Sequence, residues 1–80
     1  MMNDNEIARC VRKAMDGYFR DLDGEKPCAI YNMVISSVEK PLLEVVMAKA
    51  EQNQSKAAEW LGLNRNTLRK KLVEHRLLKS

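Results

Sequence analysis

Cationic and amide side chains gather near the carboxyl end of this 80-residue chain. Four Lys or Arg residues lie between Arg65 and Lys71, with Asn64 before this run and Asn66 inside it. A planar guanidinium matches the paired acceptor atoms of a phosphate or of a guanine edge, and an ammonium attracts any anion. These residue types indicate an anion-binding surface, although a solvated helix face carries the same side chains.

The charge of the chain is unevenly distributed. The formal net charge is +3, but residues 1–52 hold seven Lys or Arg against nine Asp or Glu, whereas residues 53–80 hold seven against two. A basic segment of this kind is typical of proteins that bind nucleic acid. On charge alone, a nucleic-acid surface and a solvated basic surface are equally good interpretations.

The sequence offers little that would support catalysis. It has no Gly-rich phosphate loop and no nucleophile–base pair, and Cys10, Cys28 and the single His75 lack metal-ligand spacing. No apolar run approaches the roughly 18 residues of a membrane span, and the acidic N-terminus is unlike a signal peptide. We therefore expect a cytoplasmic protein that is not an enzyme, with no metal, cofactor, small-molecule substrate or membrane partner.

Two short helices are expected to position the basic residues. Asn53 is suited to cap a helix over 54–61, Gly62 to end it, and Asn64 to cap a last helix from 65 to about 75. A small Ala58, the glycine turn and the apolar Leu68 have the spacing of a helix-turn-helix. The alternative is an ordinary helical hairpin within a bundle.

Two longer helices are expected upstream. The first runs from Asn5 to Leu22, capped by Asp4 or Asn5, and its apolar residues recur at helical spacing. The second runs from Pro27, placed in its first turn, to about Ala50, and we expect it to continue as one helix kinked at Pro41.

The second long helix has two apolar faces. One contains Tyr31, Val34, Ile35, Val38, Leu42, Val45 and Val46, and the other Leu43, Met47 and Ala50. Because so short a chain has too little material to cover both faces, we expect the second face to meet another copy in a two-fold dimer.

Three stretches together resemble the bacterial Fis family of nucleoid-associated proteins: Pro41-Leu42-Leu43-Glu44-Val45-Val46-Met47, Asn53-Gln54-Ser55-Lys56-Ala57-Ala58, and 62–72, which reads GLNRNTLRKKL. The C-terminal half is also similar to the DNA-binding domain of NtrC-type activators. The Fis resemblance implies an all-α fold of four helices and a single domain over 1–80. Residues 5–50 would form an intertwined homodimer core, and residues 53–76 a helix-turn-helix.

The resemblance also implies individual roles. Contacts near the bases fall to Asn64, Arg65 and Lys70, and contacts with the DNA backbone to Asn53, Ser55, Thr67, Arg69 and Lys71. Apolar residues of the two long helices would form the dimer core: Val11, Met15, Phe19, Val34, Val38, Leu42 and Val45.

The function implied is that of a sequence-tolerant, DNA-bending transcriptional regulator of the nucleoid, with helix 65–75 in the major groove of double-stranded DNA. RNA polymerase is a further partner that the resemblance raises, although Glu51-Gln52 replaces the Arg-Gly of the family before the third helix. Two alternatives remain open: the DNA-binding domain of an NtrC-type activator, and a dimer whose basic helix docks an acidic protein.

Overall fold

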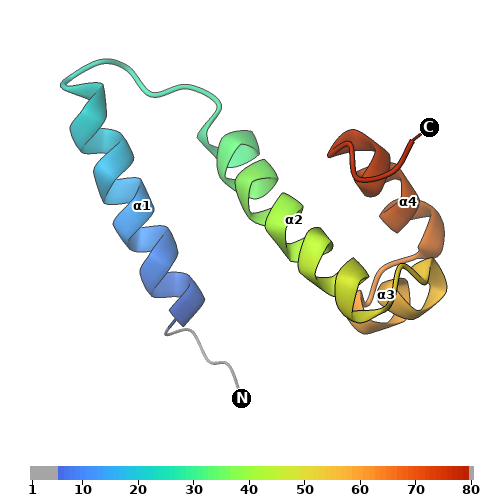
Figure 1. Cartoon of the computed structure of the whole chain (residues 1–80). Helices are drawn as coiled ribbons and strands as arrows, with labels where there is room; N and C mark the ends of the chain where they lie inside the picture. Colours follow the sequence, from blue (N-terminus) through green and yellow to red (C-terminus); the bar gives the residue numbers. More distant parts are fainter. Residues whose placement is uncertain (1–5, 80) are drawn as a thin grey trace. The chain divides into compact units, whose positions relative to one another are not determined.

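The computed structural model describes residues 6–79, and every regular element in that range is a helix. The four are α1 (Glu6–Leu22), α2 (Ile30–Lys49), α3 (Gln54–Leu61) and α4 (Arg65–Glu74) (Figure 1). The expected all-α fold of four helices is confirmed. Across the described residues, no helix combines the length and apolar character that a membrane crossing requires. The chain divides into two compact units between Ile30 and Tyr31.

Helix α1 belongs to the first unit and ends where the sequence predicts. Asp23 and Gly24 follow it with φ of 52° and 88°, so the chain leaves the right-handed helical conformation there. The rings of Tyr18 and Phe19 meet edge to face with centroids 5.4 Å apart. No residue of α1 is buried. The predicted cap at Asp4 or Asn5 lies outside the described residues.

Helix α2 differs from the prediction at its start. It begins at Ile30 and not at Pro27, because Ala29 has φ of 52° and so cannot continue a right-handed helix backward. Pro41 lies inside one uninterrupted helix, as expected, and the break that it could have caused is absent from 30–49. The kink remains a prediction.

The second unit encloses a small core between α3, α4 and the C-terminal half of α2 (Figure 1). Its buried residues are Leu43, Met47, Ala50, Ala57, Ala58, Leu68 and Leu72. The three alanines allow the helix backbones to approach closely, as Ala58 in the helix-turn-helix pattern predicts.

One prediction about α2 is wrong. The face of Leu43, Met47 and Ala50 was expected to meet another copy, but it is buried within the chain. The opposite face stays open, since Leu42 and Val45 are 47% and 57% exposed. Periodicity identifies both faces, and α3 and α4 determine which of them the chain covers itself.

The last three helices end in a common way. After α3, the Leu63 amide donates to the carbonyl of Ala58 at 2.9 Å, and Gly62 has φ of 74°. This is the Schellman arrangement, in which a left-handed residue closes the helix. The same bonds close α2 and α4, but there the left-handed positions are occupied by Glu51, Gln52 and Arg76.

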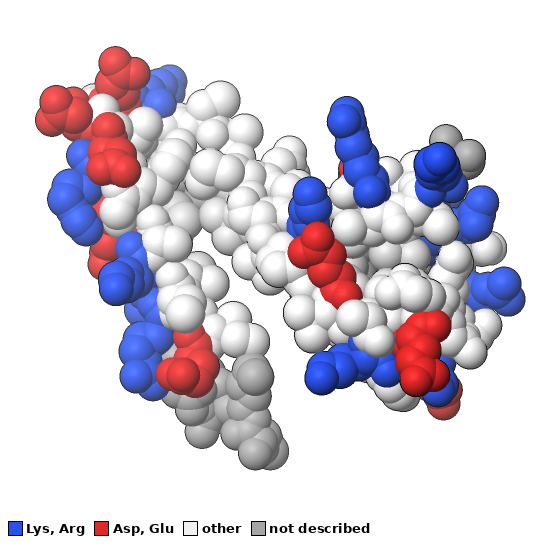
Figure 2. Space-filling view, in the orientation of Figure 1, with Lys and Arg blue, Asp and Glu red and all other residues white. Residues whose placement is uncertain are grey.

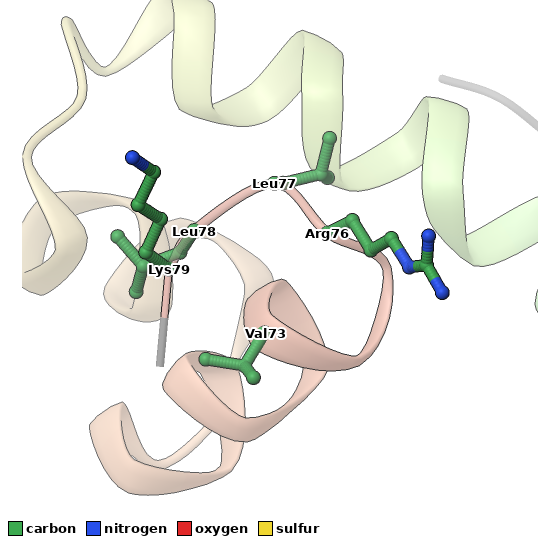
Figure 3. Close-up of a pocket in the computed structure, with 5 residues that line it drawn as sticks. All are labelled: Val73, Arg76, Leu77, Leu78 and Lys79. Carbon is green, nitrogen blue, oxygen red and sulfur yellow. The ribbon is translucent and has the colours of Figure 1, made fainter.

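The chain turns back after α4 because of this cap. The Leu77 amide donates to the carbonyl of Leu72 at 2.8 Å, and Leu77 and Leu78 pack against the core. Figure 3 shows the Leu77 side chain pointing toward α2, at a surface hollow that is also lined by Val73, Leu78, Lys79 and the exposed Arg76. The C-terminal residues thereby help to hold α4 on α2.

Replacing Gln52 with glycine is expected to stabilise the chain by about 0.5–1 kcal/mol, because φ of 64° is unfavourable for any residue with a Cβ. The matched control is Gln54→Gly, two positions later in the first turn of α3, which should lower stability. Thermal unfolding followed by far-ultraviolet circular dichroism measures both. If both variants lose the same stability, the left-handed conformation at Gln52 carries no strain.

Candidate nucleic-acid interface

Two asparagines fix the starts of the helices that carry the predicted site. The Asn53 Oδ1 accepts a hydrogen bond from the Lys56 amide at 3.0 Å, and the Asn64 Oδ1 accepts one from the Asn66 amide at 2.7 Å. Both predicted caps are therefore confirmed. Because each cap satisfies one amide of a first turn, other amides there remain available to an anion such as phosphate.

Helix α4 separates its apolar and cationic residues. Leu68 and Leu72 are 0% and 1% exposed and attach the helix to the core. The side chains on the remaining surface are exposed: Arg65, Asn66, Thr67, Arg69 and Lys70. A surface hollow lies among Asn66, Arg69, Lys70 and Val73. The structure therefore brings most predicted DNA-contacting residues of α4 to the solvent side of one rigid helix.

Lys and Arg side chains project around the α2–α4 unit in Figure 2, and acidic side chains lie among them. Ser55, at the start of α3, is also exposed. The predicted contacts at Asn53 and Ser55 thus lie on one helix start, and those at Asn64 and Arg65 on the next. A helix N-terminus favours negative charge, so both places suit the backbone of a nucleic acid.

Lys71 is placed differently from the other cations of α4. Its Nζ lies 2.7 Å from Oε2 of Glu39 on α2, and Nε2 of His75 lies 3.0 Å from the other oxygen, Oε1. The bond from Lys71, followed by that from His75, holds the pKa of Glu39 below its ordinary value. The same bond raises the pKa of Lys71.

Sequence reasoning did not find Glu39. Its partners lie 32 and 36 positions further along the chain, and no local spacing joins a residue on α2 to two residues at the end of α4.

Glu39, Glu74 and His75 also present ligand atoms within 4.8 Å of one another, a grouping able to hold a metal ion. The Lys71 ammonium is bonded to the Glu39 carboxylate, and its positive charge would repel a metal cation at this site. The absence of a metal site remains a prediction.

None of the residues assigned to a dimer core is buried. Val11, Met15 and Val34 are half-buried, whereas Phe19, Val38, Leu42 and Val45 are exposed. Trp60 on α3 is also 56% exposed, with the Lys56 Nζ 5.8 Å from the centre of its ring.

Comparison with known proteins identifies one family. The sequence model of the Fis family of bacterial regulatory proteins matches residues 34–75. A Fis-like DNA-binding protein of Ralstonia nicotianae is 58% identical over 77 residues, which cover 96% of this chain and 100% of the relative.

Two further relatives agree. A Fis-like DNA-binding protein of Neisseria meningitidis is 56% identical over 91% of this chain and 92% of its own length. The DNA-binding protein Fis of Glaesserella parasuis is 43% identical over 90% of this chain and 74% of its own length. The family match and the extent of these similarities lead to one conclusion: the chain belongs to the Fis family of bacterial regulatory proteins.

Proposed function

We propose that this protein is a homodimer that binds and bends double-stranded DNA, with α4 as the recognition helix in the major groove. The observation that carries the proposal is the division of α4 into buried leucines and exposed cations. Leu68 and Leu72 fix the orientation of the helix, so Arg65, Arg69 and Lys70 are presented together and not on a freely moving segment. Relatives described as DNA-binding support the same function.

The proposed contacts divide between bases and backbone. Asn64, Arg65 and Lys70, at or near the start of α4, reach the base edges, and the Arg65 guanidinium pairs with the two acceptors of guanine. The DNA backbone is held by Asn53, Ser55, Thr67 and Arg69. The family resemblance assigns Lys71 to the backbone as well, whereas its ammonium is bonded to Glu39 in the free chain.

Dimerisation is proposed from the uncovered apolar faces of α1 and α2. Phe19, Leu42 and Val45 are 49%, 47% and 57% exposed, and such surfaces cost free energy in water unless a partner covers them. A second copy offers the same two faces, as the isologous interface of a two-fold dimer requires. The proposed dimer core contains Val11, Met15, Phe19, Val34, Val38, Leu42 and Val45.

The cellular role follows from the family and from sequence-tolerant contacts. Since most of the proposed contacts are with the DNA backbone, affinity comes mainly from phosphates, and preference comes from a few bases and from how readily the DNA bends. We propose a cytoplasmic, nucleoid-associated regulator of transcription, with RNA polymerase as a further partner. Similarity across α1 as well as the helix-turn-helix favours a Fis protein over an NtrC-type DNA-binding domain.

A protein-docking dimer is the second candidate, and Trp60 favours it. An exposed tryptophan beside a lysine is the kind of surface that anchors protein partners. Binding to DNA that is weak and insensitive to salt would favour this candidate.

Arg65→Ala is expected to weaken binding to a duplex with an A/T-rich centre flanked by guanines by about 1–3 kcal/mol and to reduce the preference for those guanines. The loss of the bidentate contact is the cause. Gel-shift titrations measure both effects. The matched control is Arg20→Ala on α1, which removes the same charge outside the proposed interface and should change affinity little. If the two substitutions lower the affinity for the duplex equally, affinity depends on the net charge of the protein and not on the position of Arg65.

Leu42→Asp is expected to convert the dimer into monomers, because a carboxylate would be buried in the interface without a partner. Sedimentation velocity measures the change. Ser37→Asp adds the same charge to an exposed position of α2 and should leave the dimer intact. A wild-type chain that sediments as a monomer, or a Leu42→Asp variant that remains dimeric, would contradict the proposed interface.

A further inference from the structure

The carboxylate of Glu39 connects α2 to the C-terminal end of α4. One oxygen accepts a hydrogen bond from Lys71 at 2.7 Å, and the other lies 3.0 Å from a ring nitrogen of His75. The three side chains are only 21%, 30% and 10% exposed, respectively. Partial burial strengthens such bonds, because less water surrounds the charges and competes with them.

The other cations of α4 have no such partner. Among residues 6–79, no ion pair is formed by Arg65, Arg69 or Lys70, all of which are exposed. A phosphate would gain a free cation from Arg69, the one of the three that is proposed to hold the DNA backbone. To contact Lys71, it would have to replace the Glu39 carboxylate and leave that carboxylate half-buried without its strongest partner.

We propose that Glu39 is a positioning residue of the DNA-binding unit, which holds Lys71 against α2 and keeps it out of the contacts with DNA phosphates. The inference rests on the proposed function. It divides the basic residues of α4 by role, since Arg65, Arg69 and Lys70 face the nucleic acid while Lys71 anchors the helix that carries them. Glu39 thereby limits the number of phosphates that each subunit neutralises.

The salt dependence of DNA binding tests this division. Each phosphate neutralised by a protein cation adds about 0.9 to the slope of log affinity against log salt concentration. Arg69→Met should therefore lower the magnitude of the slope by about 0.9 per subunit, whereas Lys71→Met should leave it unchanged. Glu39→Gln should raise it by about 0.9 per subunit, because the lysine is released toward the DNA.

Two further variants make the comparison specific. Like Glu39→Gln, Glu44→Gln removes one negative charge from α2, but it does so at an exposed position and releases no lysine. The slope of this variant should therefore equal that of the wild type. Combining Glu39→Gln with Lys71→Met should return the slope to the wild-type value. A decrease for Lys71→Met as large as that for Arg69→Met would overturn the proposal, as would equal slopes for Glu39→Gln and Glu44→Gln.

A measurement without DNA separates this proposal from the proposed function. The titratable groups around Glu39 are Lys71 and His75, with Glu74 nearby, and hydrogen bonds, first that from Lys71, lower the pKa of Glu39. A lowered pKa means that the ionised carboxylate stabilises the fold above its ordinary pKa of 4.5, and that this stabilisation disappears as the pH falls through the lowered value.

The melting temperature of wild type should therefore exceed that of Glu39→Gln at neutral pH, and the difference should close in acid. Glu44→Gln should show no such pH-dependent difference. A wild-type chain that does not bind DNA would refute the proposed function only. If wild type and Glu39→Gln have the same melting temperature at neutral pH, the proposed role of Glu39 is refuted, whether or not the protein binds DNA.

Discussion

The burial of two leucines governs the rest of the structure. Leu68 and Leu72 occupy the inner face of α4 and are almost completely covered by α2 and α3. If these contacts were lost, a basic helix of ten residues would be too short to persist in water. The orientation of the cationic face, the ion pair to Glu39 and the path of the C-terminal residues all require that α4 be fixed first.

So small a core depends on closely packed turns. Three of its seven buried residues are alanines, so the helices approach closely but bury little apolar area. Consecutive helices must therefore reverse within a few residues, and each reversal uses a left-handed residue. Of the turns that follow α2, α3 and α4, the one after α3 has a glycine there, whereas Glu51, Gln52 and Arg76 adopt the same conformation with a side chain. Packing of Met47, Leu72 and Leu77 around these turns offsets the cost.

Local chemistry made the helix-turn-helix predictable. The bounds of α3 follow from Asn53 and Gly62, and the start of α4 follows from Asn64, because capping depends on residues within one turn of the helix end. The start of α2 was missed because nothing in the sequence marks Ala29 as left-handed. The buried face of α2 and the bond from Lys71 to Glu39 depend on residues far along the chain, which periodicity does not connect.

Trp60 has a consequence for spectroscopy. It is the one tryptophan of the chain, it is 56% exposed on α3, and a lysine ammonium lies 5.8 Å from the centre of its ring. Its fluorescence therefore reports a single environment that is distinct from the buried core. Emission from so exposed an indole lies at long wavelength and shifts to shorter wavelength when a macromolecule excludes water from it. The protein thus carries its own optical probe for whatever covers α3, without any label.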